Sequence, residues 1–294
     1  MNNRFKGLVC ALSSAVLFGL CPVFCKYSYE EGGTPLSVTF FRAFAAIPFL
    51  FAFIRYRRMT FRVKFNECRD LLLAGAMGMT ATALLLSGSY ARIGSGLATT
   101  LHFTYPALTS LCGAIIFRER LNGGARAALL LVTAGVVCFS WNTASAAPLG
   151  VALALLSGMT YTFYIMFLSH SSLQEMDTCR LLFFFSIIMG IIVGVYGLLS
   201  GGFSLTMTAA GYVFTVINSL CAMIAGLLFQ EGVRLAGGAA AAMASALEPA
   251  TSVLFGVLLF HEPMHLPELF GSLSVLAGIL LLISPKKGKE PETA

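Results

Sequence analysis

Long apolar stretches separated by short polar ones dominate the chain. Ten of these stretches have roughly 20 residues, the length of helix that crosses the hydrocarbon core of a bilayer. Because no backbone polar group can stay unpaired in hydrocarbon, each stretch predicts an α-helix. The predicted spans are 5–28, 35–54, 70–91, 94–117, 124–141, 148–169, 180–200, 208–231, 237–260 and 266–284. The pattern therefore predicts an all-α integral membrane protein with ten transmembrane helices.

The second half of the chain repeats the first at a constant spacing of 143 residues. The matched pairs include Ser14 with Ser157, Pro106 with Pro249 and Gly113 with Gly256. Five spans per unit is an odd number, so the second copy enters the membrane upside down. Inverted repeats of this kind occur in secondary transporters, whose binding site lies at the repeat interface near the bilayer midplane. We expect residues 1–143 and 144–284 to form two inverted five-helix repeats around a central cavity, and 285–294 to form a disordered cytoplasmic tail.

Composition and charge set the class and the orientation of the protein. Hydrophobic residues make up 57% of the chain and charged residues 11%, which excludes a soluble protein. Sixteen of the 19 Lys and Arg residues fall on one side of the predicted spans, Lys26 and Arg92 fall on the other, and Arg42 lies inside a span. Since cytoplasmic loops are enriched in Lys and Arg, both termini are predicted to face the cytoplasm from the cell membrane. The same topology explains the net charge of +6, so nucleic acid is not an expected partner.

Glu248 is the strongest candidate for a functional group within the membrane. An ionisable side chain at this depth costs about 2.5–3.5 kcal/mol on insertion scales, so it needs a partner or a function. Pro249 follows directly, and proline removes a backbone donor, which makes Pro249 and its repeat partner Pro106 candidate hinges. Glu248 either binds a substrate cation or a coupling proton, or forms a structural pair with His102 or Arg42.

Further polar side chains at mid-depth are candidates for lining a substrate cavity. His102 and Tyr105 lie one helical turn apart on the span that corresponds to that of Glu248. Arg42 either attracts an anionic substrate group or pins helix ends, and Lys26 either faces the cavity or snorkels to the membrane surface. The remaining candidates, for which hydrogen bonding between helices is the alternative, are Tyr161, Tyr164, Asn218 and Thr82.

Two patterns that suggest metal binding do not withstand inspection. The stretch 261–265 spells H-E-x-x-H, but Pro263 disfavours the continuous helix on which that zinc pattern depends. Cys21 and Cys25 share a helix face, yet two soft ligands without others are more typical of packing. The sequence also lacks a phosphate loop and a nucleophile elbow. We therefore expect no metal, no cofactor and no enzymatic activity.

Short motifs spread over all ten predicted spans carry a family resemblance. They are Phe18-Gly19 with Pro22 and Lys26, Arg42, Thr104-Tyr105-Pro106, Phe117-Arg118-Glu119-Arg120-Leu121, Tyr161-Thr162-Phe163-Tyr164, Ala246-Leu247-Glu248-Pro249 and Phe260-His261-Glu262. With these motifs the chain resembles EamA-type members of the drug/metabolite transporter superfamily. It departs from the family in spans one and six, where Phe18 and Tyr161 stand in place of tryptophan.

The resemblance implies export or exchange of small metabolites or amino acids across the cell membrane. The inverted repeats imply alternating access around the central site. One alternative is an anion antiporter for phosphorylated sugars or nucleotide sugars, which would need Lys26 and Arg42 both facing the cavity. An alternative of another class is a non-transporting membrane sensor or scaffold. Partners are thus a small-molecule substrate and the lipid bilayer, and small-residue pairs such as Gly75 and Gly78 leave a homodimer open beside packing within one chain.

Overall fold

All elements in the described part of the computed structural model are helices. That part comprises residues 3–116, 123, 126–127, 130–131, 133–135, 147–236, 241, 244–245, 247–261 and 266–283. Six helical runs within it are long and apolar enough to cross a membrane. They are α1 (Asn3–Glu30), α2 (Pro35–Tyr56), the continuous run of α3 (Phe65–Leu73), η1 (Ala74–Thr80) and α4 (Ala81–Ile93), then α8 (Pro148–Ser169), α9 (Thr178–Ser200) and α10 (Ala209–Ala236).

Four shorter helices complete the described part of the bundle. They are α5 (Ser95–His102), α6 (Tyr105–Ile116), α12 (Leu247–Phe260) and α13 (Leu266–Ile283). The span predicted over 94–117 is therefore present as two helices, α5 and α6, with a turn at Phe103 and Thr104 between them. Most of the span predicted over 124–141, and the tail over 285–294, lie outside the described residues.

This bundle buries many polar side chains beside its apolar core, and it exposes many large apolar side chains. Thr215 and Asn218 are fully buried in the first half of α10, whereas Ile115 is 69% exposed and Leu198 is 80% exposed. Contact between this apolar surface and water would be unfavourable, and large exposed apolar patches favour association or contact with lipid. Hydrocarbon tolerates it, and the buried hydroxyl and amide groups then join helices by hydrogen bonds.

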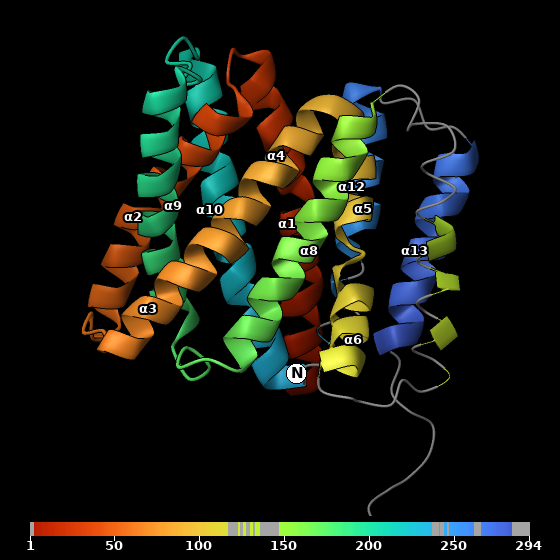
Figure 1. The fold of residues 1–294 in the computed structure, drawn as a ribbon, viewed down its shortest axis with the longest axis horizontal. Helices are drawn as coiled ribbons and strands as arrows, with labels where there is room; N and C mark the ends of the chain where they lie inside the picture. Colours follow the sequence, from red (N-terminus) through yellow and green to blue (C-terminus); the bar gives the residue numbers. More distant parts are fainter. Residues whose placement is uncertain are drawn as a thin grey trace, which may run out of the picture.

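The helices pack in two corresponding sets. Helix α1 lies along α10 and also contacts α12, whereas α8 lies along η1 and α4 and also contacts α5 and α6 (Figure 1). The 143-residue offset carries α1 onto α8, α10 onto the run of α3, η1 and α4, and α12 onto α6. The contacts of α1 in one set thus correspond to those of α8 in the other.

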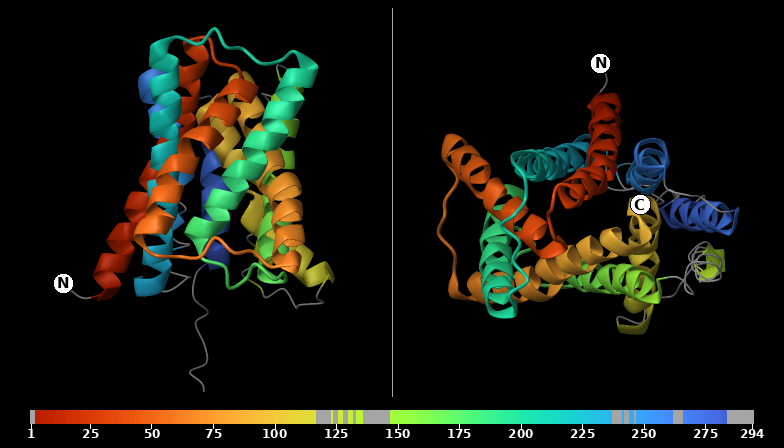
Figure 2. Two further views of the ribbon diagram at one scale, coloured as in Figure 1. Left: turned by 90° about the vertical axis from the view of Figure 1, so that its left-hand side faces the viewer. Right: turned by 90° about the horizontal axis from the view of Figure 1, so that it is seen from above.

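Helices α2 and α9, which the offset also superposes, pack side by side and run antiparallel. At one end, the Ser204 backbone N–H beyond α9 donates to the Ser37 hydroxyl near the start of α2, at 2.9 Å. At the other end, Arg180 near the start of α9 donates to the Arg62 carbonyl beyond α2, at 2.7 Å. Two equivalent helices of the repeat therefore point in opposite directions. Figure 2 shows the same pair from the side and from above.

Further hydrogen bonds tie the two halves of the chain together at both ends of the bundle. The buried Asp70 carboxylate in α3 accepts from the Ser172 backbone N–H at 3.1 Å and from the Ser172 hydroxyl at 2.8 Å. At the opposite end, the Thr208 N–H donates to the Glu31 carbonyl at 3.0 Å. Each bond joins the first half of the chain to a connection in the second half.

The π-helical segment η1 interrupts the third span at its glycine pair. A Cβ atom on Gly78 would lie 2.8 Å from the Cβ of Tyr164 in α8, and one on Gly75 would lie 2.9 Å from Cδ1 of Ile188 in α9. These distances are shorter than real Cβ contacts, so no larger residue fits without movement of α8 or α9. The small residues thus serve packing within the chain, and they do so at a π-helix, a feature frequent at functional sites.

Candidate functional site

The break between α5 and α6 is the centre of the candidate site. Helix α5 ends at His102, and α6 begins at Tyr105, so that Pro106, which has no backbone N–H, is the second residue of α6. Helix α8 approaches the break closely, because a Cβ atom on Gly158 would lie 3.1 Å from the His102 carbonyl oxygen. The Thr162 hydroxyl of α8 donates to the Tyr105 carbonyl at 3.2 Å. The break therefore exposes backbone carbonyls to α8 near the middle of the bundle.

Four of the predicted site residues meet at this break and form an aromatic cluster, which consists of His102, Tyr105, Tyr161 and Tyr164. The ring centroids of Tyr105 and Tyr161 are 4.7 Å apart in an edge-to-face arrangement. His102 lies 5.5 Å from Tyr105 and 5.3 Å from Tyr161, and Tyr161 lies 5.5 Å from Tyr164. These spacings are favourable for aromatic pairs, so the cluster is a rigid surface with hydroxyl groups at its edges.

The hydrogen bonds of Ser157 fix the proton of the neutral His102 ring. Ser157 Oγ donates its single proton to the Ala154 carbonyl at 2.6 Å. Its contact with His102 Nδ1 at 2.9 Å must then be one in which Nδ1–H donates to Ser157 Oγ. The neutral imidazole consequently carries its proton on Nδ1 and presents Nε2 as an acceptor.

Glu248 lies in the first turn of α12, beside the aromatic cluster. Its carboxylate is close enough to Cys21, Tyr90, Tyr105 and Tyr161 to act on them electrostatically. No hydrogen bond or ion pair joins this carboxylate to another described residue. The structural pair with His102 or Arg42, which the sequence left as the alternative, is therefore not formed in the described part of the chain.

Helix α1 approaches the backbone of Glu248 at a glycine. A Cβ atom on Gly19 would lie 2.6 Å from the Cβ of Thr251 and 2.8 Å from the Glu248 carbonyl oxygen. Only glycine permits this approach, because any other side chain would collide with α12. Cys21, two residues further along α1, lies 3.9 Å from the Asn218 carbonyl of α10, and the Glu248 carboxylate also acts on it electrostatically.

Arg42 of α2 approaches the same cysteine from another helix. Its guanidinium acts electrostatically on Cys21, Cys25 and Tyr29, and it forms no ion pair with a described residue. Its backbone carbonyl accepts a hydrogen bond from the Ser219 hydroxyl of α10 at 2.8 Å. Cys21 is thus influenced by both the Glu248 carboxylate and the Arg42 guanidinium, neither of which has an ionic partner among the described residues.

The other predicted residues lie outside the aromatic cluster. The Lys26 ammonium lies over the Phe260 ring, 4.4 Å from its centroid, near the end of α12. The Asn218 amide donates to Cys25 Sγ at 3.0 Å, and its Oδ1 receives no hydrogen bond from a described residue. Thr82 and Thr160 join α4 to α8 through their hydroxyl groups at 2.7 Å.

Four residues that the sequence analysis did not select take part in the site. They are Gly19, Cys21, Tyr90 and Ser157. Ser157 had a detectable signal, since it pairs with Ser14 in the repeat, and Tyr90 is a buried polar residue that also bonds to Thr99. Cys21 had no sequence signal for a place in the site, because that place depends on which helices pack against α1.

No group of three potential metal ligands is found among the described residues. Of the H-E-x-x-H stretch, only His261 is described, and residues 262–265 lie outside the described part. The side chain of Pro106 is likewise not described.

The six apolar helices of membrane length in the described part of the chain, with buried polar groups among them, define a multi-pass membrane protein. A family model narrows this class. The model of the EamA-like transporter family matches residues 5–141 and again residues 148–284. The chain therefore belongs to the EamA-like transporter family, and the resemblance drawn from its motifs is confirmed.

Two individual proteins are similar to this chain. An uncharacterized protein of Pseudomonas aeruginosa is 27% identical over 225 residues, which cover 73% of this chain and 74% of that protein. A solved structure titled only "Crystal structure of protein" covers 95% of this chain and 98% of its own, with a TM-score of 0.69 and 14% identity. At that identity the likeness shows a shared fold and nothing about substrate.

Proposed function

We propose that the protein is a secondary active transporter that exports small metabolites or amino acids by alternating access. Its family is one of membrane transporters, and its family model matches twice along the chain. The proposal includes ten transmembrane helices arranged as two inverted repeats. Support comes from the antiparallel course of α2 and α9, which the repeat offset superposes, and from the corresponding contacts of α1 and α8. An axis that exchanges equivalent helices and reverses their direction lies in the membrane plane.

The observation that carries the proposal is the Glu248 carboxylate, which acts electrostatically on the aromatic cluster and has no ionic partner among the described residues. A carboxylate in the membrane interior without a partner is unfavourable, unless a ligand or a proton compensates its charge. Tyrosine rings attract cations through their faces and supply hydroxyl groups at their edges. Glu248 acts electrostatically on Tyr105 and Tyr161, and the proposal assigns the ammonium group of the substrate to the space between them.

Arg42 extends the same reasoning to the other end of the substrate. Arginine binds carboxylate with two parallel hydrogen bonds, and the Arg42 guanidinium has no ionic partner among the described residues. Glu248 and Arg42 each act electrostatically on Cys21, and the proposal assigns the ammonium group of an amino acid to Glu248 and its carboxylate to Arg42. The anion antiporter is less consistent with this arrangement, since the Lys26 ammonium lies on the Phe260 ring and Glu248 would repel a phosphate.

The proposed direction is export, with both termini in the cytoplasm. The distribution of Lys and Arg supports this orientation, because the stretch 55–69 and the region after residue 284 carry many basic residues. A sensor or scaffold is the alternative of another class, and it predicts no flux at all.

The decisive experiment is a flux assay with the full chain in reconstituted vesicles. The probes are a neutral amino acid, the amine without its carboxylate and the acid without its amine. We expect the amino acid to be transported most rapidly, and Glu248→Gln and Arg42→Gln each to reduce that flux roughly tenfold to a hundredfold, as the loss of a charged hydrogen bond worth about 1.5–3 kcal/mol implies.

The matched control is Glu30→Gln, which removes an exposed carboxylate at the end of α1. It should leave the flux unchanged. Absence of flux for every probe would favour the sensor or scaffold, and unchanged flux in Glu248→Gln would remove Glu248 from the mechanism.

A further inference from the structure

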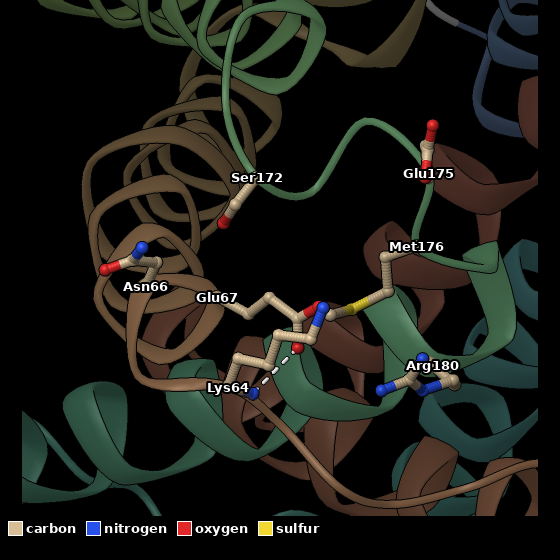
Figure 3. Close-up of a pocket in the computed structure, with 7 residues that line it drawn as sticks. All are labelled: Lys64, Asn66, Glu67, Ser172, Glu175, Met176 and Arg180. Carbon is tan, nitrogen blue, oxygen red and sulfur yellow. Dashed lines mark hydrogen bonds between the residues drawn. The ribbon is translucent and has the colours of Figure 1, made fainter.

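A second site lies at the end of the bundle, away from the aromatic cluster. It is a cavity of about 400 Å³, here called the rim pocket (Figure 3). The first half of the chain contributes Lys64, Asn66 and Glu67, and the second half contributes Ser172, Glu175 and Arg180. Met176 adds one buried apolar side chain. The volume is within the range of ligand sites in proteins and exceeds the size of a single phosphate ester.

Two cationic side chains line the pocket without an ionic partner among the described residues. Neither Lys64 nor Arg180 forms an ion pair with a described carboxylate. One NH2 group of Arg180 donates to the Arg62 carbonyl at 2.7 Å, which holds the guanidinium in place. Its Nε–H is buried and meets no acceptor in the described part of the chain. A buried donor without an acceptor is unfavourable, so a ligand that supplies an acceptor for Nε–H would be favoured here.

Two of the nearest carboxylates, Glu67 and Asp70, are already engaged by other groups. Glu67 Oε2 accepts from the Lys64 backbone N–H at 2.8 Å, the bond drawn in Figure 3, and so caps α3. Asp70 accepts from Ser172 and from Arg69, whose Nε lies 3.0 Å from its Oδ1. Glu175 is exposed, and Figure 3 shows its carboxylate directed away from Lys64. The cations therefore remain available to a ligand.

The surroundings of the pocket add positive charge. Residues 55–70 contain six Lys or Arg residues and only two acidic residues, Glu67 and Asp70. Basic clusters next to membrane spans attract the anionic headgroups of lipids, and Lys and Arg together are the usual ligands of phosphate. Glu175 at the opening disfavours a ligand with several negative charges, which limits the ligand to one phosphate.

We infer that the rim pocket binds a single phosphate group between Lys64 and Arg180. The group belongs either to the headgroup of an anionic phospholipid or to a soluble phosphate. Lys64 lies in the first half of the chain and Arg180 in the second, so the bound phosphate bridges the two halves beside the bonds of Asp70 with Ser172. This site is independent of the transported substrate.

The test measures thermal unfolding of the purified, delipidated full chain in detergent. The probes are phosphatidylglycerol, inorganic phosphate and a fatty acid, which is an anionic amphiphile without phosphate. Ligands that bind the folded state raise the unfolding temperature with concentration. We expect phosphatidylglycerol or inorganic phosphate to stabilise the protein, and Lys64→Gln and Arg180→Gln to weaken that binding roughly tenfold or more.

The matched control is Arg55→Gln, which removes the same charge from the same basic stretch outside the pocket. Stabilisation by phosphatidylglycerol alone identifies a lipid site, and stabilisation by inorganic phosphate identifies a site for soluble phosphate. Equal stabilisation by the fatty acid, equal weakening in Arg55→Gln, or unchanged binding in Lys64→Gln would each overturn the proposal. Because Lys64 is exposed, its variant decides the outcome even when Arg180→Gln does not fold.

Discussion

The contact of α6 with α8 and the contact of α12 with α1 are equivalent under the repeat offset, yet they differ in chemistry. In the first, the Thr162 hydroxyl donates to the Tyr105 carbonyl at 3.2 Å. In the second, Gly19 stands at the position of Thr162 and lies against the carbonyl of Glu248, the position of Tyr105. The duplicated backbone contact is retained, while the side chains have diverged.

This divergence gives the site two unlike faces. The face between α6 and α8 is an aromatic surface whose helices are joined by a hydroxyl, and the face between α12 and α1 presents a carboxylate whose helices meet at a glycine. A symmetric pair of faces would offer a ligand the same chemistry twice. An asymmetric pair recognises a molecule with an apolar side and a charged group, and it also fixes the orientation of that molecule.

The largest effect should come from making the two faces alike. Glu248→Tyr copies the first-half residue into the second half, removes the carboxylate and adds a ring beside Gly19. We expect amino acid flux in vesicles to fall to the background of empty vesicles. Tyr105→Phe, which removes only a neutral hydroxyl worth about 0.5–1.5 kcal/mol, should change the flux less than about tenfold. Equal losses in both variants would show that the asymmetry has no role in recognition.

The next effect concerns the two backbone contacts. Gly19→Ala forces a Cβ atom to within 2.6 Å of the Thr251 Cβ, and overpacking of this kind costs about 1–3 kcal/mol. Thr162→Ala loses one hydrogen bond between helices, which averages about 0.6 kcal/mol. Thermal unfolding in detergent should therefore show a clearly lower midpoint for Gly19→Ala than for Thr162→Ala. The reverse order would mean that α1 can move away from α12 without loss.

The smallest effect separates two equivalent serines. Ser157 holds the proton of His102 on Nδ1, whereas Ser14 donates to the Ala225 carbonyl of α10 at 2.7 Å. Ser157→Ala should reduce flux a few-fold, because His102 then loses its fixed tautomer. Ser14→Ala should cost about 0.6 kcal/mol of stability and leave the flux intact. A flux that falls equally in both variants would assign Ser157 to packing alone.

Much of the fold and part of the site follow from the sequence. Spans of 20 apolar residues and a constant offset predict where the helices lie, and the offset also pairs Tyr105 with Glu248. Periodicity places Tyr161 and Tyr164 on one face of α8, where both join the aromatic cluster. These features depend only on local pattern, which a sequence records directly.

The remainder depends on contacts between distant helices. Nothing along the chain shows that the Thr82 hydroxyl is bonded to Thr160, or that Asp70 is buried against Ser172. The pattern predicts a single span over 94–117, but it does not place the turn at Phe103 and Thr104, because apolar residues continue across the break. The π-helix cannot be predicted for the same reason, since its turn contains the same kinds of apolar residue as the α-helical turns beside it.

That π-helix has a consequence for how the third span tolerates changes in length. A π-helical turn accommodates one residue more than an α-helical turn along the same path. Deleting a single residue between Ala74 and Thr80 therefore converts the turn to regular α-helix while its flanks keep their neighbours, Asp70 with Ser172 and Thr82 with Thr160. Elsewhere in this span the same deletion would rotate everything beyond it by about 100°, since an α-helix has 3.6 residues per turn. Between Phe65 and Ile93, η1 is thus the segment in which a one-residue deletion keeps both ends of the helix in register with their neighbours.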